Sequence, residues 1–223
     1  MIPRIIHQVY GIFDDGICIE EIGIFHKNTS ITKEFCDNNN IGYQLWDLRD
    51  SEILIDKYPE YKEIWNNFRF PIQRADFIRY LILYDQGGIY VDCDIYPTTN
   101  IDELFLKEQF FVRWNNDSKP YNAVLGSIQQ NIVYKNIINN CVTDTLRCQS
   151  MKVYDNWKGR LVFQTTGHFG LMRSLKQSKI KKESFLDILE IVNDMKGHRV
   201  VGENPLFYDE NASLWWDTMK QNL

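Results

Sequence analysis

The sequence predicts an α/β fold with a mostly parallel central sheet flanked by helices. Short apolar segments rich in β-branched residues alternate with longer segments of helical periodicity, which is the order typical of βα units. The chain has 223 residues, of which 44% are hydrophobic and 25% charged, as in globular domains that bury a core of their own. No internal repeat and no linker rich in proline, glycine or serine divides it. We therefore expect one domain over residues 1–223.

Four segments have the composition of buried strands, and glycine or proline marks where two of them end. Gly11 follows the first of these segments, and Pro97 follows the third. The expected strands are 2–10, 42–46, 89–95 and 110–114.

Helical periodicity is clearest after Pro71, where apolar residues recur at helical spacing until Gly87 and Gly88 stop the helix. A second helical segment is expected to be interrupted near Pro59. Ser30 or Thr32 is the expected cap of the first helix. The expected helices are 30–39, 51–65, 71–86, 128–141 and 182–193.

Charge and cysteine usage exclude several classes of protein. The net charge of −5 argues against a nucleic-acid binder or a polybasic membrane binder. The cysteines are odd in number, widely spaced and without a CxxC pair, which indicates free thiols in a reducing compartment. No uninterrupted apolar stretch is long enough to span a bilayer, and no leader pattern opens the sequence. We therefore expect a cytoplasmic protein with no transmembrane segment and no nucleic-acid partner.

The acidic pair Asp92 and Asp94 ends the third expected strand. Residues two apart on a strand point to the same face, so the two carboxylates would converge. Two unit charges ~4 Å apart repel by about 4 kcal/mol at an effective dielectric of 20. A hard divalent cation with oxygen ligands would offset this repulsion and bridge to a diphosphate. The alternative is a pair of solvated turn aspartates before Pro97. In a parallel sheet ligands bind at the carboxyl ends of strands, where Tyr10 also falls.

The preceding helix carries Asp76 and Arg79, which share a face because they are three residues apart. They can form an intrahelical ion pair, or they can bind sugar hydroxyls and a phosphate oxygen. His7 lies in the pattern of the first strand, and we expect it to be a hydrogen-bonded structural histidine.

The stretch PIQRADFIRYLILYDQGGIYVDCDIYP, residues 71–97, resembles the signature of DXD-motif sugar transferases of glycosyltransferase family 32. That family includes yeast outer-chain mannosyltransferases and bacterial and viral enzymes, and the glucosylating domains of large clostridial toxins share a related pattern. The opening IPRIIHQVYG resembles the family's first strand, IPKIIHQIWG. Residues 166–170, TGHFG, resemble a T-G-P segment with His168 in place of the proline. Residues 210–215, ENASLW, resemble the E-x-x-S-x-W end of the toxin domains, and the H-x-x-x-S-W end of the mannosyltransferases without its histidine.

The resemblance implies a GT-A type, Rossmann-like nucleotide-sugar-binding fold and a catalytic group of four residues. Asp94 would ligate Mn²⁺ or Mg²⁺ directly. Asp92 would hold the ribose or sugar, or reach the metal through water. Asp76 and Arg79 would grip the sugar and its phosphate oxygen. The half 1–100 would bind the nucleotide sugar and end in the DXD motif, and the half 101–223 would form the acceptor side with a closing C-terminal loop.

The resemblance also implies a nucleotide-binding role for residues at both ends of the chain. Tyr10, beside Val9, falls where the family usually has a base-stacking tryptophan, although from the residues alone it is as well explained as a core ring. Trp215 would contact the diphosphate through its indole N–H, although Trp residues more often pack in cores.

The same C-terminal segment would complete the metal shell. The resemblance assigns this role to Glu210 and Ser213, the latter also at the donor. Asn211 and Asp209 are substitutes for the histidine that this sequence lacks.

The expected function is therefore metal-dependent transfer of a hexose from a nucleotide diphosphate sugar to an acceptor hydroxyl, with retention of configuration. The donor, a UDP-sugar or GDP-mannose, stays open, as does the acceptor, which is a glycan, a lipid-linked sugar or a protein. One alternative is a non-catalytic module that binds nucleotide sugar or carbohydrate. A weaker one is a phosphohydrolase of the haloacid-dehalogenase type, which would need Thr or Val where Tyr96 stands.

Overall fold

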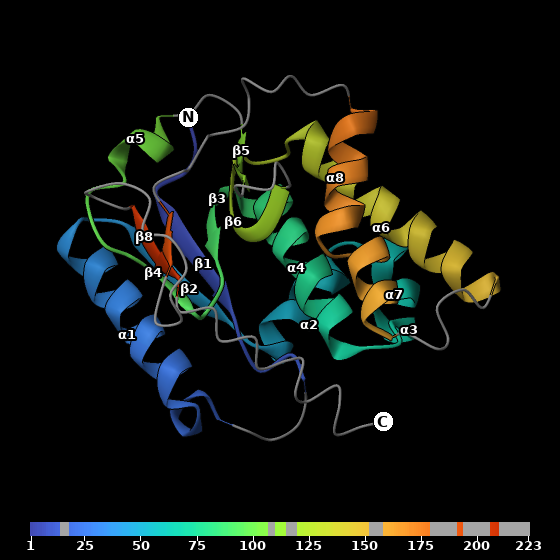
Figure 1. The fold of residues 1–223 in the computed structure, drawn as a ribbon, viewed down its shortest axis with the longest axis horizontal. Coiled ribbons are helices and arrows are strands. Elements are labelled where there is room, and N and C mark those ends of the chain that lie inside the picture. Colours follow the sequence, from blue (N-terminus) through green and yellow to red (C-terminus); the bar gives the residue numbers. More distant parts are fainter. Residues whose placement is uncertain are drawn as a thin grey trace.

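The computed structural model describes residues 1–13, 18–106, 110–114, 120–151, 158–178, 191–193 and 206–209. Two sheets and the helices around them make up this part of the chain (Figure 1). The helices with an α-helical hydrogen-bond pattern are α1 Gly23–Asn38, α2 Leu48–Asp56, α3 Lys62–Asn67, α4 Pro71–Gln86, α5 Asp102–Phe105, α6 Ile132–Ser150, α7 Lys158–Thr165 and α8 His168–Gln177. The 3₁₀ turns are η1 Ile19–Glu21 and η2 Pro59–Tyr61.

The larger sheet has five strands in the order β2-β1-β3-β6-β5. Strand β1 pairs in parallel with β2 and with β3, whereas β6 runs antiparallel to both β3 and β5. All strands except β6 therefore point the same way, which confirms the predicted α/β class with a mostly parallel central sheet. The strands are β1 Ile5–Val9, β2 Gly42–Trp46, β3 Gly88–Val91, β5 Phe110–Trp114 and β6 Pro120–Ser127.

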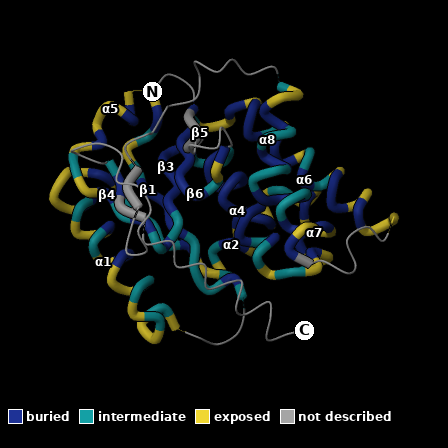
Figure 2. Tube along the Cα trace, in the orientation of Figure 1, coloured by how far each residue is buried: buried dark blue, intermediate teal, exposed yellow. Residues whose placement is uncertain are grey.

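Two hydrophobic clusters cover the two faces of this sheet. Along β3, Ile89 and Val91 belong to the cluster that includes Cys36 of α1, whereas Tyr90 belongs to the cluster of α4, α6 and α8. This alternation follows from the period of two along a strand. Helix α4 is buried almost all round because the sheet covers one side of it and α6 the other (Figure 2).

The strand order places a topological switch point between β1 and β3. From β1 the chain passes through α1 to β2 on one side, and then returns through α2, α3 and α4 to β3 on the other side of β1. In open α/β sheets ligands bind in the crevice at such a point, outside the carboxyl ends of the strands. Here those ends are Val9 and Val91.

The predicted strand 89–95 is wrong in its second half. The strand β3 ends at Val91, and the chain turns so that the Ile95 amide donates to the Asp92 carbonyl at 3.0 Å. A separate strand, β4 Ile95–Pro97, then joins a second sheet of order β4-β8-β7, with β8 Phe207–Asp209 and β7 Ile191–Asn193. Pro97 is tolerated there because β4 is an edge strand. The same-face argument for Asp92 and Asp94 therefore does not hold, since both lie in a turn.

Several predicted helix limits also change. The first helix begins at Gly23 rather than near Ser30, and the Thr32 hydroxyl bonds the Asn28 carbonyl inside the helix instead of capping it. The second begins at Leu48, after the cap Asp47, and is interrupted at Pro59 as predicted. Helix α6 spans Ile132–Ser150 instead of 128–141. Of the predicted helix 182–193, residues 182–190 lie outside the described residues and Ile191–Asn193 is a strand.

Candidate functional site

The DXD turn lies against the carboxyl end of β1. The Cys93 thiol donates to the Val9 carbonyl at 3.3 Å, and the Asp92 amide donates to the Ala123 carbonyl of β6 at 2.9 Å. The Tyr10 amide donates to the Trp46 carbonyl at 2.8 Å, which continues the β1–β2 pairing past Val9. The turn is thus tied to both strands that flank β3.

The carboxylate of Asp92 is held on the α4 side of the turn. Its Oδ1 accepts from Arg79 Nη1 at 2.9 Å and from the Tyr90 hydroxyl at 2.6 Å. Burial raises the pKa of Tyr90 well above its ordinary value, so this hydroxyl stays protonated and donates. The Asp92 side chain keeps 30% of its surface exposed, against 6% for Arg79. The carboxylate therefore lies at the boundary between a buried polar cluster and solvent.

Arg79 is the centre of that buried cluster. Besides Asp92, its Nη1 binds the Asn122 carbonyl at 2.9 Å, its Nε binds the Ala75 carbonyl at 3.2 Å, and its Nη2 lies 3.2 Å from Asp76 Oδ1. The guanidinium also lies 4.8 Å from the centre of the Tyr90 ring. Burial opposes the charge of Arg79, but Asp92, Tyr90 and Asp76 outweigh it and raise its pKa.

Asp76 is buried and accepts hydrogen bonds at both oxygens. Its Oδ1 accepts from Asn122 Nδ2 at 2.8 Å, and its Oδ2 accepts from the Thr166 hydroxyl at 3.1 Å. Burial raises the pKa of Asp76 to about 6, although Arg79 acts in the opposite direction. The intrahelical ion pair considered from the sequence is therefore present. In this arrangement Arg79 binds the Asp92 carboxylate, and Asp76 in turn binds Arg79. Binding of a sugar donor by Asp76 and Arg79 stays a prediction.

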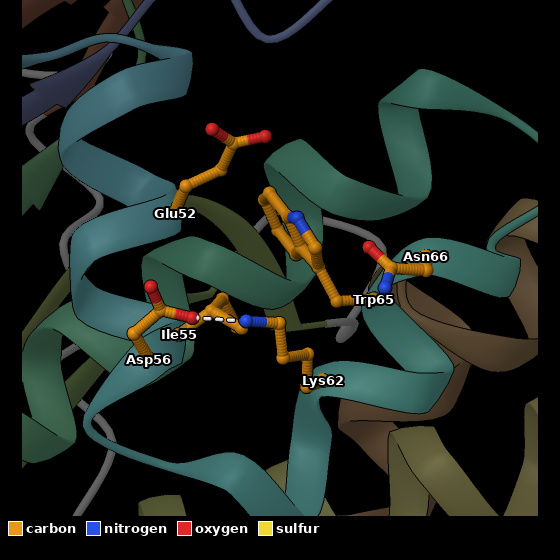
Figure 3. A pocket seen from close by; sticks show the side chains of 6 residues that line it. All are labelled: Glu52, Ile55, Asp56, Lys62, Trp65 and Asn66. Atoms are coloured by element: carbon orange, nitrogen blue, oxygen red, sulfur yellow. Dashed lines mark hydrogen bonds and ion pairs between the residues drawn. The ribbon is translucent and has the colours of Figure 1, made fainter.

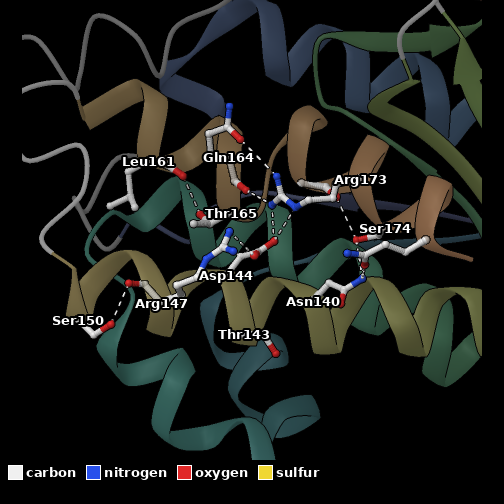
Figure 4. Close-up of polar contacts among 12 residues, drawn as sticks. Asn140, Thr143, Asp144, Arg147, Ser150, Leu161, Gln164, Thr165, Arg173 and Ser174 are labelled. Carbon is white, nitrogen blue, oxygen red and sulfur yellow. Dashed lines mark hydrogen bonds and ion pairs between the residues drawn. The ribbon is translucent and has the colours of Figure 1, made fainter.

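The corner between α7 and α8 brings Thr166 to Asp76. Asp144 of α6 accepts from Arg147 at 3.1 Å and from Arg173 Nε of α8 at 3.1 Å, while Arg173 Nη1 binds Gln164 Oε1 at 3.3 Å (Figure 4). These contacts join three helices. The TGHFG segment, residues 166–170, lies at this corner. It is thus positioned by ion pairs between residues outside the segment.

Aromatic rings gather beside this corner. The rings of Tyr121 and His168 stack with centres 5.6 Å apart and planes 6° apart. Phe163 and Phe169 contact the same histidine, with ring centres at 4.7 and 4.2 Å. His168 therefore lies in an aromatic cluster next to Asn122 and Gly167.

Of two buried polar residues in β1, the role of His7 was predicted from the sequence and the role of Gln8 was not. His7 is a buried structural histidine as expected, since its Nδ1 accepts from Trp46 Nε1 at 3.1 Å and its Nε2 lies 3.1 Å from the Gly87 carbonyl. Gln8 was missed, although its side chain is buried and contacts the backbone of the DXD turn. The available signal for Gln8 was an amide side chain in a strand whose other residues, apart from His7, are apolar. Tyr10 is half-buried, and its ring meets Phe25 edge-on with centres 5.9 Å apart.

The C-terminal part of the chain reaches the site through β8. Strand β8 pairs antiparallel with β4, and Asp209 lies opposite Ile95, directly after the DXD turn. Glu210, Asn211, Ser213 and Trp215 lie outside the described residues, as does the side chain of Asp209. Their predicted roles at the metal and the donor stay predictions.

The donor set of the turn fits a hard divalent cation, because it offers carboxylate oxygens from Asp92 and Asp94 near the surface. Among the described residues, no group of three or more histidine, cysteine, aspartate or glutamate side chains could hold a metal. Residues outside the described ranges, water or a bound diphosphate would supply further ligands. No helix within the described ranges is long and apolar enough to span a bilayer.

A hollow of about 260 Å³ lies between α2 and α3 (Figure 3). It is crossed by an ion pair of 2.6 Å between Lys62 and Asp56. The lining side chains are Glu52, Ile55, Asp56, Lys62, Trp65 and Asn66. None of them belongs to β1, β3 or the turn, so this hollow is not part of the candidate site.

Comparison with known proteins agrees with the motif. The model of a family described as a glycosyltransferase sugar-binding region containing a DXD motif matches residues 21–111. The chain is 32% identical over 141 residues to mannosyl phosphorylinositol ceramide synthase CSH1 of Saccharomyces cerevisiae, a match that covers 63% of this chain and 35% of that protein. It is 32% identical over 147 residues to the uncharacterized glycosyltransferase L373 of Acanthamoeba polyphaga mimivirus, covering 63% of this chain and 55% of that protein.

The chain thus spans 35% and 55% of the lengths of these two relatives. Among solved structures, the PaToxG glycosyltransferase matches with a TM-score of 0.49 and 18% identity, covering 79% of this chain and 70% of that chain. The family and sequence matches confirm the resemblance to DXD-motif sugar transferases that the motifs indicate.

Proposed function

We propose that the protein is a metal-dependent glycosyltransferase, from the match of residues 21–111 to the model of a family described as a glycosyltransferase sugar-binding region containing a DXD motif. It transfers a hexose from a nucleotide diphosphate sugar to an acceptor hydroxyl. The observation that carries the proposal is the position of Asp92, which Arg79 and Tyr90 hold at the carboxyl end of β3, beside the switch point. That position is where open α/β sheets bind nucleotides.

The divalent cation, when bound, neutralises the leaving diphosphate as a Lewis acid. Asp94 and the exposed part of Asp92 would supply its oxygen ligands from this chain. Arg79 fixes the Asp92 carboxylate through a charge-assisted hydrogen bond, so the ligand is already oriented before the donor arrives. Tyr10, at the end of β1, offers a partly exposed ring to the nucleotide base.

Residues beyond Asp209 complete the site in this proposal. The support is the pairing of β8 with β4, which brings the chain to the DXD turn just before Glu210. Glu210, Ser213 and Asn211 would add oxygen ligands, and Trp215 would donate to the diphosphate. A segment that covers the donor also excludes water and limits hydrolysis.

We further propose that transfer retains the configuration at the anomeric carbon. The acceptor hydroxyl attacks the carbon on the face that the diphosphate leaves, and the leaving phosphate oxygen takes the proton of that hydroxyl. NMR of the product tests this step, since an inverted anomeric configuration would overturn it.

GDP-mannose is the first donor to test. The support is that relatives are named mannosyl phosphorylinositol ceramide synthase and inositol phosphoceramide mannosyltransferase. UDP-hexoses form the second group of donors. For the acceptor, a glycan, a lipid-linked sugar and a protein are compared in the same assay.

A cytoplasmic location is also a proposal, and its support is that all five cysteines are free. Cell fractionation tests it.

The decisive experiment is a thermal-shift screen of nucleotide sugars with and without Mn²⁺, followed by an assay of nucleotide release. We expect a donor that raises the melting temperature only with metal, because ligands that bind the folded state stabilise it. Asp94→Ala should abolish the metal-dependent shift, whereas Lys62→Ala, in the hollow between α2 and α3, should retain it. Turnover that survives in Asp94→Ala would overturn the proposal. Donor binding without nucleotide release would identify a binding module instead.

A further inference from the structure

We propose that Gln8 is a positioning residue that sets the conformation of the DXD turn from the neighbouring strand β1. This inference concerns a residue to which the motif assigns no role, and its consequence for metal binding rests on the proposed function. Gln8 has no exposed surface, and its Nε2 donates to the Asp92 carbonyl at 3.2 Å and to the Ile95 carbonyl at 3.4 Å. One amide group therefore spans the turn from its first residue to the residue that follows it.

The orientation of this amide is itself determined. The Tyr43 hydroxyl of β2 donates to Gln8 Oε1 at 2.9 Å, so the oxygen faces β2 and the two N–H groups face the turn. Burial raises the pKa of Tyr43 well above its ordinary value, which keeps the hydroxyl a donor. The hydrogen bonds thus run in one direction, from Tyr43 through Gln8 to the turn.

The buried position of the Gln8 side chain argues that its hydrogen bonds matter, because a buried amide needs partners. Burying an amide without hydrogen-bond partners is destabilising, whereas Ile6, two residues earlier on the same face of β1, is apolar and belongs to a buried hydrophobic cluster. Gln8 instead donates from its side-chain amide to the backbone carbonyls of Asp92 and Ile95. Arg79 holds the Asp92 carboxylate from the other side. The side chain and the backbone of Asp92 are therefore fixed independently, the first by α4 and the second by β1.

The consequence is a preformed metal-binding turn. Without Gln8 the Asp92 carbonyl keeps its bond from the Ile95 amide but loses the one from β1. The Ile95 carbonyl loses its bond from Gln8 as well, so the turn between β3 and β4 can shift. Residues that orient metal ligands typically change metal affinity by 10–100-fold when they are replaced. We expect Gln8→Met, which keeps the volume and removes the donors, to weaken Mn²⁺ binding in the presence of GDP or UDP by about tenfold or more.

The test compares Gln8→Met with Tyr43→Phe and with the matched control Ile6→Val. Hydrogen–deuterium exchange of the metal-free protein reports the Ile95 amide, which closes the turn on the Asp92 carbonyl. Electron paramagnetic resonance reports Mn²⁺ binding with GDP or UDP. We expect faster exchange at Ile95 and weaker Mn²⁺ binding in Gln8→Met, a smaller change in Tyr43→Phe, and neither change in Ile6→Val. Saturating Mn²⁺ should restore most of the turnover number of Gln8→Met, which a general loss of structure would not allow.

Exchange at Ile95 and Mn²⁺ affinity that stay at wild-type values in Gln8→Met would overturn the inference, as would equal changes in Ile6→Val. A wild-type protein that binds no Mn²⁺ with either nucleotide would instead contradict the proposed function. In that case the exchange measurement alone still decides whether Gln8 positions the turn.

Discussion

Arg79 and Asp92 form an ion pair of 2.9 Å between the middle of α4 and the first residue after β3. The pair joins a side chain that is almost wholly buried to one that reaches the surface. Because Arg79 also binds Asp76 and the Asn122 carbonyl, the carboxylate at the surface is anchored to α4 and to β6 together.

Removing Arg79 should destabilise the protein strongly. Arg79→Met would leave the buried Asp76 without its cation, and breaking a buried pair in this way costs about 3–5 kcal/mol. Urea unfolding measures the loss. Arg4→Ala is the control, since its ion pair with Asp102 is largely exposed and should contribute less than about 1 kcal/mol. A cost below about 1 kcal/mol for Arg79→Met would contradict the buried network.

Tyr90→Phe should affect both stability and the metal site. The change removes the hydroxyl that donates to Asp92 at 2.6 Å, and we expect a cost of about 1–2 kcal/mol in unfolding free energy. Mn²⁺ binding with nucleotide should weaken, because the Asp92 carboxylate then accepts a hydrogen bond from Arg79 but no longer one from residue 90. Tyr61→Phe, which removes a hydroxyl bonded to Asn139 far along the chain from the turn, should lower stability without changing Mn²⁺ binding. Equal Mn²⁺ affinity in the two variants would argue against a role for Tyr90 in orienting Asp92.

Gly88→Ala should be among the most damaging glycine substitutions. Gly88 has φ of +93°, and an added Cβ would lie 2.7 Å from Ile5 Cγ2 and 2.8 Å from the Ile5 carbonyl oxygen. Strain and overlap together should cost about 2 kcal/mol or more. Gly23→Ala is the matched control, because its added Cβ meets no heavy atom within 4 Å apart from the adjacent residues and the backbone of its own helix, and Ala favours a helix. Thermal melts of both variants give the comparison, and a stable Gly88→Ala would show that β1 and β3 are less closely packed than described.

Acid should weaken the fold through His7. Trp46 Nε1 can only donate, so His7 Nδ1 accepts and Nε2 carries the proton that reaches the Gly87 carbonyl. Burial lowers the pKa of His7 to about 4, below the 6.5 of the unfolded chain. The unfolded state therefore binds the extra proton between these values, and about 3 kcal/mol of stability is lost as the pH falls from 6.5 to 4.

Chemical unfolding of the wild type and His7→Gln from pH 7 to pH 4 measures this effect. The difference in unfolding free energy between the two proteins should shrink as the pH falls. His26→Gln, at an exposed position on α1, controls for the removal of a histidine. A difference that stays constant over this range would show that His7 does not carry the acid sensitivity.

The limits of several helices and strands could be predicted from local sequence patterns. The segments 42–46, 71–86 and 110–114 were predicted within their observed limits, because apolar spacing and the punctuation by proline and glycine are local properties. The pair Asp76 and Arg79 was also predictable, since the helical repeat alone brings the two side chains together. The start of α1 was not, because a buried polar residue such as Thr32 looks like a cap when its tertiary surroundings are unknown.

The sequence by itself determined the α/β class, the helix that carries Asp76 and Arg79, and the acidic motif at the end of a strand. Only the tertiary structure decided that β3 stops at Val91, that Arg79 faces Asp92, and that Gln8 and Asn122 join the site from β1 and β6. It also decided that β8 brings Asp209 beside the turn. Periodicity reports the neighbours of a residue within its own element, whereas these contacts join residues from 13 to more than 100 positions apart, and their formation depends on how the strands are ordered in the sheets.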